Sequence, residues 1–327
     1  MTDTLRKAAV RASALMLGVF VLVAVFVDLL ASSAPLVMSH SSRIVVLPAL
    51  TEPSTVAGRT SSEIAARLRN EDWAVWAPLR IDGRTLSSAG PLRAPSRRHL
   101  LGTDLYGHDV LGQCLYGART ALGFAAAVLV IALGVGVPLG AFAGGGSRGV
   151  DFLLTRAIEL SGLLPTVIAL ALVQAANLVP SAVGFVLVLG VHRAVRLARI
   201  VRGESLRLLS EPYVAAARAL GARPTRVLWR HVLPHTAGPV LVSAAFTVAA
   251  VVALEAAYSF LGLGNATGQP SWGTLLSQAG AGVGATVLLP PALCVLLTTA
   301  GLLLLADALD DAGAPRRRSV ARPARHH

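Results

Sequence analysis

The chain has 327 residues, of which 54% are hydrophobic and only 14% charged, and its mean hydropathy is +0.66. This composition is too apolar and too poor in charge for an ordinary soluble domain, and it indicates a membrane protein. The net charge of +12 does not indicate nucleic-acid binding, because the basic residues lie beside apolar segments without interleaved aromatic residues, so that membrane topology and anionic lipid explain them better.

Six segments are long and apolar enough, or nearly so, to cross a bilayer, which takes about 20 residues of helix. The first follows three basic residues and contains one acid, Asp28. Its apolar run is longer than that of a secretory signal and no clear cleavage site follows, so we interpret it as an uncleaved anchor. The six predicted spans cover residues 14–31, 118–143, 153–176, 181–198, 237–257 and 286–306.

The fourth predicted span is the weakest, because His192, Arg193 and Arg196 crowd its end. If six helices alternate, the arginines near the N-terminus, between the second and third spans, after the fourth span and in the tail all fall on one side. By the positive-inside rule that side is the cytoplasm. Both termini are therefore predicted to be cytoplasmic.

The predicted spans divide the chain into four parts. Residues 1–31 form a cytoplasmic N-terminus and the first span, and residues 32–113 an extracytoplasmic insertion. Residues 114–306 form the transmembrane core, which includes a cytoplasmic loop at 199–235, and residues 307–327 form a basic cytoplasmic tail. Long translocated segments largely escape the positive-inside rule, so the arginines of the insertion do not contradict this topology.

The insertion shows some secondary-structure signals. Residues 43–50 (RIVVLPAL) predict a short strand, and Thr60 followed by Glu63 is a capping-box pattern that opens a helix to about Asn70. Trp73 and Trp76 offer apolar anchors. We expect a small insertion that rests on the outer mouth of the membrane core rather than an independent domain, because its apolar content is too low for a large core.

The second predicted span and the residue that follows it are rich in residues that allow close helix packing. These are Gly134, Gly136, Pro138, Gly140 and Gly144. Small residues permit neighbouring helices to approach, and proline permits a kink. These residues suit a helix that must slide against its neighbours, but ordinary membrane-helix packing explains them equally well.

Lys7 is the only lysine in the chain, so the phosphate-binding G-x-x-x-x-G-K-[ST] loop is absent from this sequence. The sequence also contains no H-E-x-x-H or C-x-x-C pattern. We therefore do not expect an enzyme, and any ATP hydrolysis that drives this protein must occur on another polypeptide.

The predicted cytoplasmic loop contains a short helix with clear boundaries. Pro212 suits the first helical turn, and Gly221 is placed to end the helix in a left-handed conformation. Tyr213, Ala217 and Leu220 then share one face. Such a helix can be inserted into a groove of another protein and moved as one body, or it can lie on the inner leaflet as an amphipathic helix.

Four motifs in order resemble the permeases of binding-protein-dependent ABC importers. The run from Glu211 to Gly221, followed by Leu233 and Pro234, resembles their EAA motif. The stretches at 99–111, at 254–264 with 270–273, and at 307–311 are similar to the C-type subunit of dipeptide, oligopeptide and nickel importers. The resemblance implies that the ATPase-coupling residues are Glu211, Pro212, Tyr213, Ala215, Ala216, Ala217, Arg218, Leu220, Gly221, Leu233 and Pro234.

The resemblance also implies a fold, partners and a function. The fold is an all-α polytopic membrane protein of six transmembrane helices, with the MetI-like fold of type I ABC importers. The partners are a second related permease subunit, two ATP-binding subunits that hold ATP and Mg²⁺, and an extracytoplasmic substrate-binding protein. The insertion could help to receive the binding protein. This chain itself is expected to bind no cofactor. The function is ATP-driven import of di- or oligopeptides across the cell membrane by alternating access. Nickel or another small solute is the alternative cargo, and a self-sufficient secondary transporter or channel is the alternative class.

Two positions depart from the family pattern. Ala215 occupies the position of the motif's glutamate, so a charged contact usual in the family is missing and the docking face is more apolar. His108 replaces the arginine of the usual Gly-Arg-Asp before the second span. We can assign no consequence to the second change.

Several polar residues near the membrane also need interpretation. Glu255 belongs to the third matching stretch and is expected near the outer end of the fifth span, where ionisable groups are usually functional. We assign it a structural or gating role rather than a proton relay, together with Ser259, Phe260 and Trp272. Glu159 lies three residues after Arg156 and is expected to pair with it.

Two groups of residues have metal-ligand chemistry, but neither predicts a metal site. His231 and His235 have helical i, i+4 spacing, yet Pro234 between them disturbs the helix that would align them. Asp104, His108 and Asp109 lie in a glycine-bounded turn beside the second span, which accounts for them without an ion. Cys114 and Cys294 are expected to be free thiols within or near spans.

Overall fold

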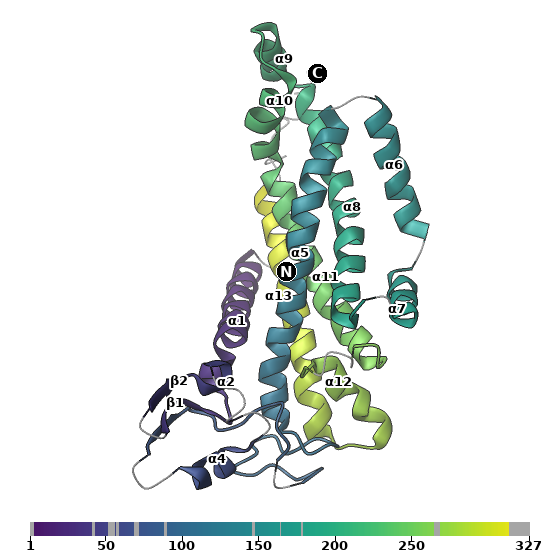
Figure 1. The fold of residues 1–327 in the computed structure, drawn as a ribbon. Coiled ribbons are helices and arrows are strands. Elements are labelled where there is room, and N and C mark those ends of the chain that lie inside the picture. Colours follow the sequence, from purple (N-terminus) through teal and green to yellow (C-terminus); the bar gives the residue numbers. More distant parts are fainter. Residues whose placement is uncertain are drawn as a thin grey trace, which may run out of the picture.

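The computed structural model describes residues 3–40, 43–51, 56, 59–68, 72–87, 90–145, 148–163, 165–177, 179–264 and 269–313. Long helices run side by side, with a small β-containing insertion at one end and a helical loop, which contains α9 and α10, at the other (Figure 1). Five helices of the described chain are long and apolar enough to cross a membrane. They are α1 (Asp3–Leu30), α5 (Val110–Gly145), α8 (Ser181–Leu209), α11 (Ala237–Phe260) and α13 (Ala285–Gly313).

The third predicted span, residues 153–176, is not one helix. The structure has α6 (Arg148–Leu163) and α7 (Thr166–Ala176) in its place, so the prediction of six full-length spans is corrected to five and a shorter apolar helix. Pro165 precedes α7 with extended backbone, and it has no N–H to continue the hydrogen-bond ladder of α6. At 11 residues α7 is about 16 Å long, roughly half of the hydrocarbon thickness.

Several helices extend beyond the predicted boundaries. α8 continues to Leu209, so residues 199–209 of the predicted loop are helical, and α13 continues through residues 307–313 of the predicted tail. Residues 314–327, which hold the rest of that tail, lie outside the described part of the chain. The end of the insertion's helix near Asn70 also lies outside it.

The insertion contains a three-stranded antiparallel sheet with the order β2-β1-β3. β1 (Pro35–His40) pairs with β2 (Arg43–Val46) and with β3 (Ala74–Trp76). The strand predicted over 43–50 ends at Val46, because Leu47 takes a positive φ of 49° and Pro48 begins α2 (Pro48–Thr51). β1 and β3 were not predicted.

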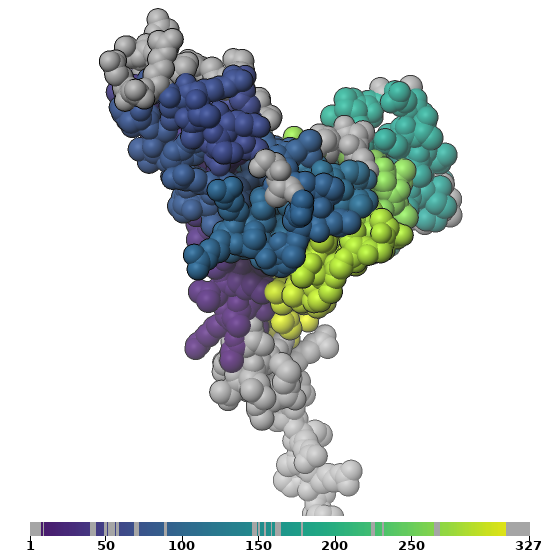
Figure 2. Space-filling view, turned by 90° about the horizontal axis from the view of Figure 1, so that it is seen from below, coloured from purple at the N-terminus to yellow at the C-terminus, as the bar shows by residue number. Residues whose placement is uncertain are grey.

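A small apolar cluster supports this sheet. It contains Met38, Val45 and Ile64 among its buried residues, with Trp76 packed against them, whereas Trp73 is 48% exposed. Ile64 lies on α4 (Ser61–Arg67), whose N-terminus is the predicted capping box: Thr60 and Glu63 each accept from the other's backbone N–H. Viewed from this end, the insertion and the region of α7 lie at opposite edges of the molecule (Figure 2).

α1 is joined to α5 by a polar contact around Asp28. Its carboxylate accepts from Arg119 Nη1 at 2.7 Å and from the Tyr116 hydroxyl at 3.1 Å. The same hydroxyl lies 2.9 Å from the Ala31 carbonyl oxygen, and Arg119 Nε donates to the Ala24 carbonyl. The acid that interrupts the first span is therefore paired, as acids at membrane depth usually are.

α5 and α8 pack closely along a row of small residues. Gly136, Gly140 and Gly144 of α5 lie directly against Ala194, Ala198 and Ser205 of α8, as expected for small residues at four-residue spacing. A Cβ on Gly136 would lie 2.6 Å from the carbonyl oxygen of Ala194, whereas a Cβ on Gly134 would meet no atom within 4 Å. Three of the glycines therefore serve helix packing and Gly134 does not.

Buried polar contacts tie the turn before α5 to the loop before α13. Asp104 accepts from the backbone N–H groups of Tyr106 and His108 at 2.9 and 2.7 Å, and from the amides of Gln113 and Gln278 at 2.8 and 3.0 Å. Both carboxylate oxygens are thus occupied by protein donors. Burial alone would raise the pKa of Asp104, but the contacts from His108 and Gln278 outweigh it and hold that pKa below its ordinary value.

A second polar contact closes the same turn. His99 Nδ1 lies 2.8 Å from a carboxylate oxygen of Asp109, and His99 Nε2 lies 2.9 Å from the Ser87 hydroxyl. The other oxygen of Asp109 accepts from the Gly112 backbone N–H at 2.8 Å, in the first turn of α5. This chain of contacts fixes the insertion's last segment to the beginning of α5.

The glycine row predicts a difference between two substitutions on one helix. We expect Gly136→Ala to destabilise the protein by about 1–3 kcal/mol, because the backbone of α8 must move away from the new methyl group. Gly134→Ala should be neutral or stabilise by up to about 1 kcal/mol, because alanine has the higher helix propensity. Melting temperatures of the two purified variants in one detergent test this, and equal effects would contradict the packing described here.

The contacts of Asp104 predict how stability depends on pH. Because its pKa is lowered in the folded protein, its contribution is complete above the ordinary aspartate pKa of about 4 and is lost as the pH falls through the lowered pKa. Asp104→Asn should therefore melt at a lower temperature than the wild type at neutral pH, with a loss of about 1–3 kcal/mol that shrinks in strong acid. A deficit that is the same at every pH would refute this role.

Candidate functional site

The short helix predicted in the loop is α9 (Pro212–Ala219), and its boundaries are those expected from the sequence. Glu211 precedes it with extended backbone, and Pro212 occupies the first turn. At the other end the Gly221 N–H donates to the Arg218 carbonyl at 2.9 Å, and Gly221 has a φ of +83°. A residue with a Cβ would be strained in that conformation, so the glycine ends the helix.

α9 is attached to the bundle by one buried side chain. Val214 is fully buried and belongs to a cluster formed by α5, α8 and the segment that follows α9. Its buried partners are Ala141, Leu197, Val201, Leu208, Val227, Leu228 and Val232. α9 is therefore packed against α5 and α8 through this side chain. Sequence reasoning missed Val214, although it is the one large aliphatic side chain within the helix.

The opposite face of α9 is exposed. Leu220 is 89% exposed and Tyr213 42%, while Ala217, predicted on the same face, is half-buried. The remaining predicted coupling residues of the helix, Ala215, Ala216 and Arg218, are exposed as well. Large exposed apolar side chains on a short rigid helix form a surface suited to binding another protein.

The ends of α9 are linked to the neighbouring helices. Arg207 in the last turn of α8 pairs with Glu204 at 2.5 Å and with Glu211 at 3.3 Å. These pairs are exposed and contribute little stability, but they orient the start of α9. On the other side, the Tyr213 and His235 rings lie with their centroids 6.1 Å apart.

The segment after α9 returns to the bundle without a break. α10 (Pro224–Val227) is followed by a π-helical turn (Leu228–Val232) and a 3₁₀ turn (Leu233–Thr236) that leads into α11. Proline cannot donate a backbone hydrogen bond, and a local change of helix type around Pro234 accommodates it. Leu233 is half-buried against the Val214 cluster and Pro234 is exposed.

The residues predicted to act in gating are only partly brought together. Glu255, buried within α11, accepts from the Ser259 hydroxyl at 2.9 Å and from the Ser271 hydroxyl at 2.7 Å. Its other oxygen, Oε2, is buried without a partner in the described chain. Phe260 is 49% exposed and lies outside this contact. Ser271 was not predicted, although it belongs to the same matching stretch.

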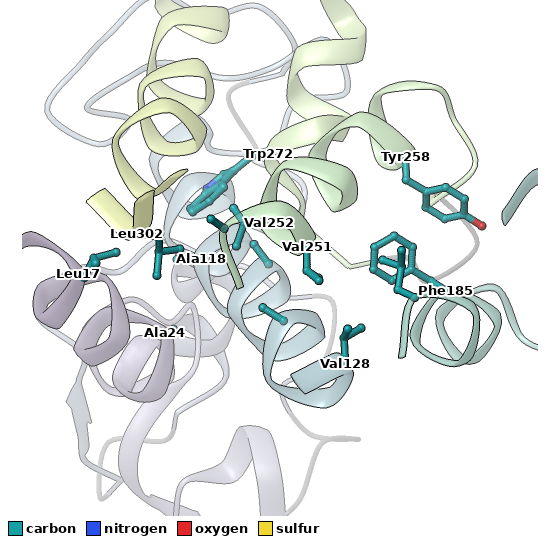
Figure 3. Close-up of a cluster of buried hydrophobic side chains, with 14 of the residues drawn as sticks. Leu17, Ala24, Ala118, Val128, Phe185, Val251, Val252, Tyr258, Trp272 and Leu302 are labelled. Atoms are coloured by element: carbon teal, nitrogen blue, oxygen red, sulfur yellow. The ribbon is translucent and has the colours of Figure 1, made fainter. Parts of the chain in front are cut away.

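Trp272 begins α12 (Trp272–Ser277) and is fully buried. Its indole N–H donates to the Cys114 carbonyl of α5 at 2.9 Å, and its ring meets Phe20 of α1 edge-on at 5.9 Å. Figure 3 shows it within the apolar cluster that joins these helices. Gly273 lets α12 approach α11, because a Cβ there would lie 2.7 Å from Ser259 Cβ. Glu255 and Trp272 therefore fix α12 to the bundle.

The described elements occupy distinct positions along the bundle. One end presents α9, and the other end is closed by hydrogen bonds among α5, α11 and α12. Between them lie apolar helices of membrane-spanning length. Glu159, the remaining acid singled out in the sequence, pairs with Arg156 on α6 at 2.5 Å as expected, with both side chains exposed.

Comparisons with known proteins agree with this geometry. The dipeptide transport system permease protein DppC of Alkalihalophilus pseudofirmus is 30% identical over 251 residues, which cover 75% of this chain and 82% of that protein. The oligopeptide transport system permease protein OppC of Bacillus subtilis is 31% identical over 252 residues, which cover 75% of this chain and 81% of that protein.

A solved structure shares the fold. A chain of the inward-facing methionine ABC transporter MetNI superposes with a TM-score of 0.50 and 21% identity, over 63% of this chain and 98% of that chain. This confirms the expected helical MetI-like architecture. Residues 136–319, which include α9 and all of α13, match the family of binding-protein-dependent transport system inner membrane components. This chain belongs to that family and is one of its multi-pass membrane proteins.

Proposed function

We propose that this chain is the permease subunit of an ABC importer for di- or oligopeptides. The observation that carries the proposal is α9: a glycine-terminated helix with an exposed apolar face, attached to α5 and α8 through Val214. The similarity to permeases named for dipeptide and oligopeptide transport supports peptides as the cargo.

The proposed complex contains two ATP-binding subunits, a second related permease subunit and an extracytoplasmic substrate-binding protein. ATP and Mg²⁺ bind to the ATP-binding subunits, and this chain binds no cofactor. The transport route lies between the two permease subunits, because a bundle of this size seldom encloses a peptide-sized path. Family membership implies an ATPase and a binding protein as partners; their number is part of the proposal.

The mechanism follows from the path of contacts. Closure of the ATP-binding subunits moves the two α9 helices of the permease pair toward each other. Because Val214 is packed between α5 and α8, and because these helices lie against each other along the glycine row, they move as one unit. The route then opens outward, receives cargo from the binding protein, and opens inward after hydrolysis.

The predicted docking residues form one surface in this proposal. Tyr213, Ala216, Arg218 and Leu220 face the ATP-binding subunit, and Ala215 lies among them in place of the usual glutamate. The contact then depends on apolar area more than on an ion pair. A few side chains can carry most of an interface's binding energy, and tyrosine and arginine, both present here, are among the commonest of them.

The proposed orientation places α9 and both termini in the cytoplasm and the insertion outside. Support comes from the arginine distribution and from the structure, in which α9 and the insertion lie at opposite ends of the bundle (Figure 1).

Two single-cysteine substitutions test the orientation, at Ala66 in α4 and Ala216 in α9, both exposed. We expect a membrane-impermeant thiol reagent to label Ala66→Cys in intact cells and to label Ala216→Cys only after the membrane is opened. The wild type is the control, since Cys114 is buried and Cys294 is half-buried. Labelling of Ala216→Cys in intact cells would invert the proposed topology.

One substitution on α9 tests the coupling role. We expect Leu220→Asp to lower ATP-driven peptide uptake by the reconstituted complex by about tenfold or more, because a charge replaces an apolar anchor of the interface. The melting temperature should not change, because Leu220 is 89% exposed.

Leu86→Asp is the matched control, since Leu86 is 61% exposed at the opposite end of the molecule. Unaltered uptake with Leu220→Asp, or an equal loss with both variants, would refute the docking role of α9.

A further inference from the structure

A groove of about 770 Å³ lies between α8, α11 and α13. Two cationic side chains of α8, Arg193 and Arg196, line it, and we call them the groove arginines. Hydroxyl groups face it from the other two helices, from Thr247 of α11 and Thr299 of α13. Much of the remaining wall is apolar, with Phe246 as its largest side chain.

The groove arginines lie at membrane depth. Arg193 is 12 residues and Arg196 15 residues from Ser181, where α8 begins, which places them about 18 Å and 22 Å along the helix axis. If α8 starts at one surface of a hydrocarbon layer about 30 Å thick, both side chains lie past the centre of that layer, in the half farther from Ser181. Charged groups there face a bundle interior or a water-filled path and are usually functional.

The groove arginines have no acidic partner among the described residues, unlike two other arginines of the same helix. Arg202 pairs with Asp151 and Arg207 with Glu204. Neither groove arginine forms an ion pair or a hydrogen bond with the described chain, and the Nε atom of Arg193 is buried without a partner. Their positive charge is therefore available to a ligand.

Asp310 also lines the groove, but it forms no ion pair with either groove arginine in the described structure. Asp310 lies on α13, 11 residues after Thr299, which separates the two by about 16 Å along the helix. The groove arginines themselves are three residues apart on one helix, where like charges repel each other. An anion bound between them would remove both the repulsion and the lack of hydrogen-bond acceptors.

We propose that this groove binds a carboxylate of the transported peptide through Arg193 and Arg196. The proposal rests on the proposed function and adds the chemical group that the permease recognises. Every linear peptide with a free C-terminus carries such a carboxylate, and guanidinium groups bind carboxylates with paired, charge-assisted hydrogen bonds. Thr247 and Thr299 can hydrogen-bond the peptide's amide groups, and the apolar wall accommodates its side chains.

The same charges bear on the alternative cargo. A divalent metal cation such as Ni²⁺ would be repelled by two unpaired guanidinium groups in a low-dielectric groove. The groove therefore disfavours free nickel and favours an anionic or zwitterionic solute. An anionic lipid headgroup could also bind guanidinium groups, and the experiment must separate it from a peptide carboxylate.

Binding to the complete transporter tests the proposal. The complex would be placed in nanodiscs, free of nucleotide and of the binding protein, and titrated with trialanine and with trialanine C-terminal amide. We expect the acid to bind about tenfold or more tightly than the amide, because only the acid carries the negative charge. The Arg193→Gln, Arg196→Gln double variant should lose this preference.

Matched variants separate this role from a general effect on the helix. Arg199→Gln removes a charge from an exposed residue of α8 that does not line the groove, and it should keep the wild-type preference. Arg193→Lys with Arg196→Lys keeps the charge and should retain most of it. Melting temperature and basal ATP hydrolysis of each complex show whether the double variant is folded and assembled.

Several outcomes would overturn the proposal. These are equal binding of acid and amide by the wild type, an unchanged preference in the double variant, and an equal loss in Arg199→Gln. Repeating the titration in phosphatidylcholine nanodiscs with and without phosphatidylglycerol tests whether an anionic lipid headgroup occupies the groove instead. If the double variant has an effect only when phosphatidylglycerol is present, the groove binds lipid. Failure of the proposed function would be seen separately, as absence of ATP-driven peptide uptake by the wild-type complex.

Discussion

The contact of α5 with α8 along Gly136, Gly140 and Gly144 is the constraint on which the rest of the structure depends. In a bilayer, apolar side chains gain nothing from leaving the lipid, so two helices stay together through close packing of their backbones. The row of small residues provides that packing and makes the pair a single body. Val214 then connects α9 to this body, because its side chain is buried in a cluster to which both helices contribute. A force on α9 therefore moves two membrane helices together.

The opposite end of the bundle is held by polar contacts rather than by apolar packing alone. Asp104, with donors from its own turn and from Gln278, joins the start of α5 to the segment before α13. Glu255 joins α11 to α12 through Ser271, and Trp272 joins α12 to α5. These contacts are buried, so each has a large energetic effect if a partner is lost. The end that carries α9 lacks a comparable buried network among the described residues, which suits a region that must move.

Local signals in the sequence were sufficient for some elements and not for others. The positions of five of the six spans, the capping box of α4 and the left-handed Gly221 follow from short-range rules, and the structure agrees with them. The division of the third span at Pro165 was missed, although Arg156 and Glu159 interrupt its first half, because composition alone does not measure helix continuity. Strands β1 and β3 depend on pairing between distant residues. The burial of Val214 and the contact of Ser271 with Glu255 likewise depend on which helices meet. No local pattern in this sequence shows which helices are in contact.

The arginines of α8 show how one helix can serve two tasks. Near its end at α9, Arg202 and Arg207 are paired with carboxylates, one from α6 and one from its own preceding turn, so their charge orients neighbouring segments. Further toward the centre, the pairing stops, and Arg193 and Arg196 line the groove without a partner. A bundle selected only for stability would pair or replace charges at that depth, since an unpaired cation in a low-dielectric setting is costly. The proposed peptide carboxylate would supply the missing negative charge for part of the transport cycle. The positive-inside rule accounts for Arg202 and Arg207 near the end of α8. Under the proposal made above, Arg193 and Arg196 instead serve cargo recognition.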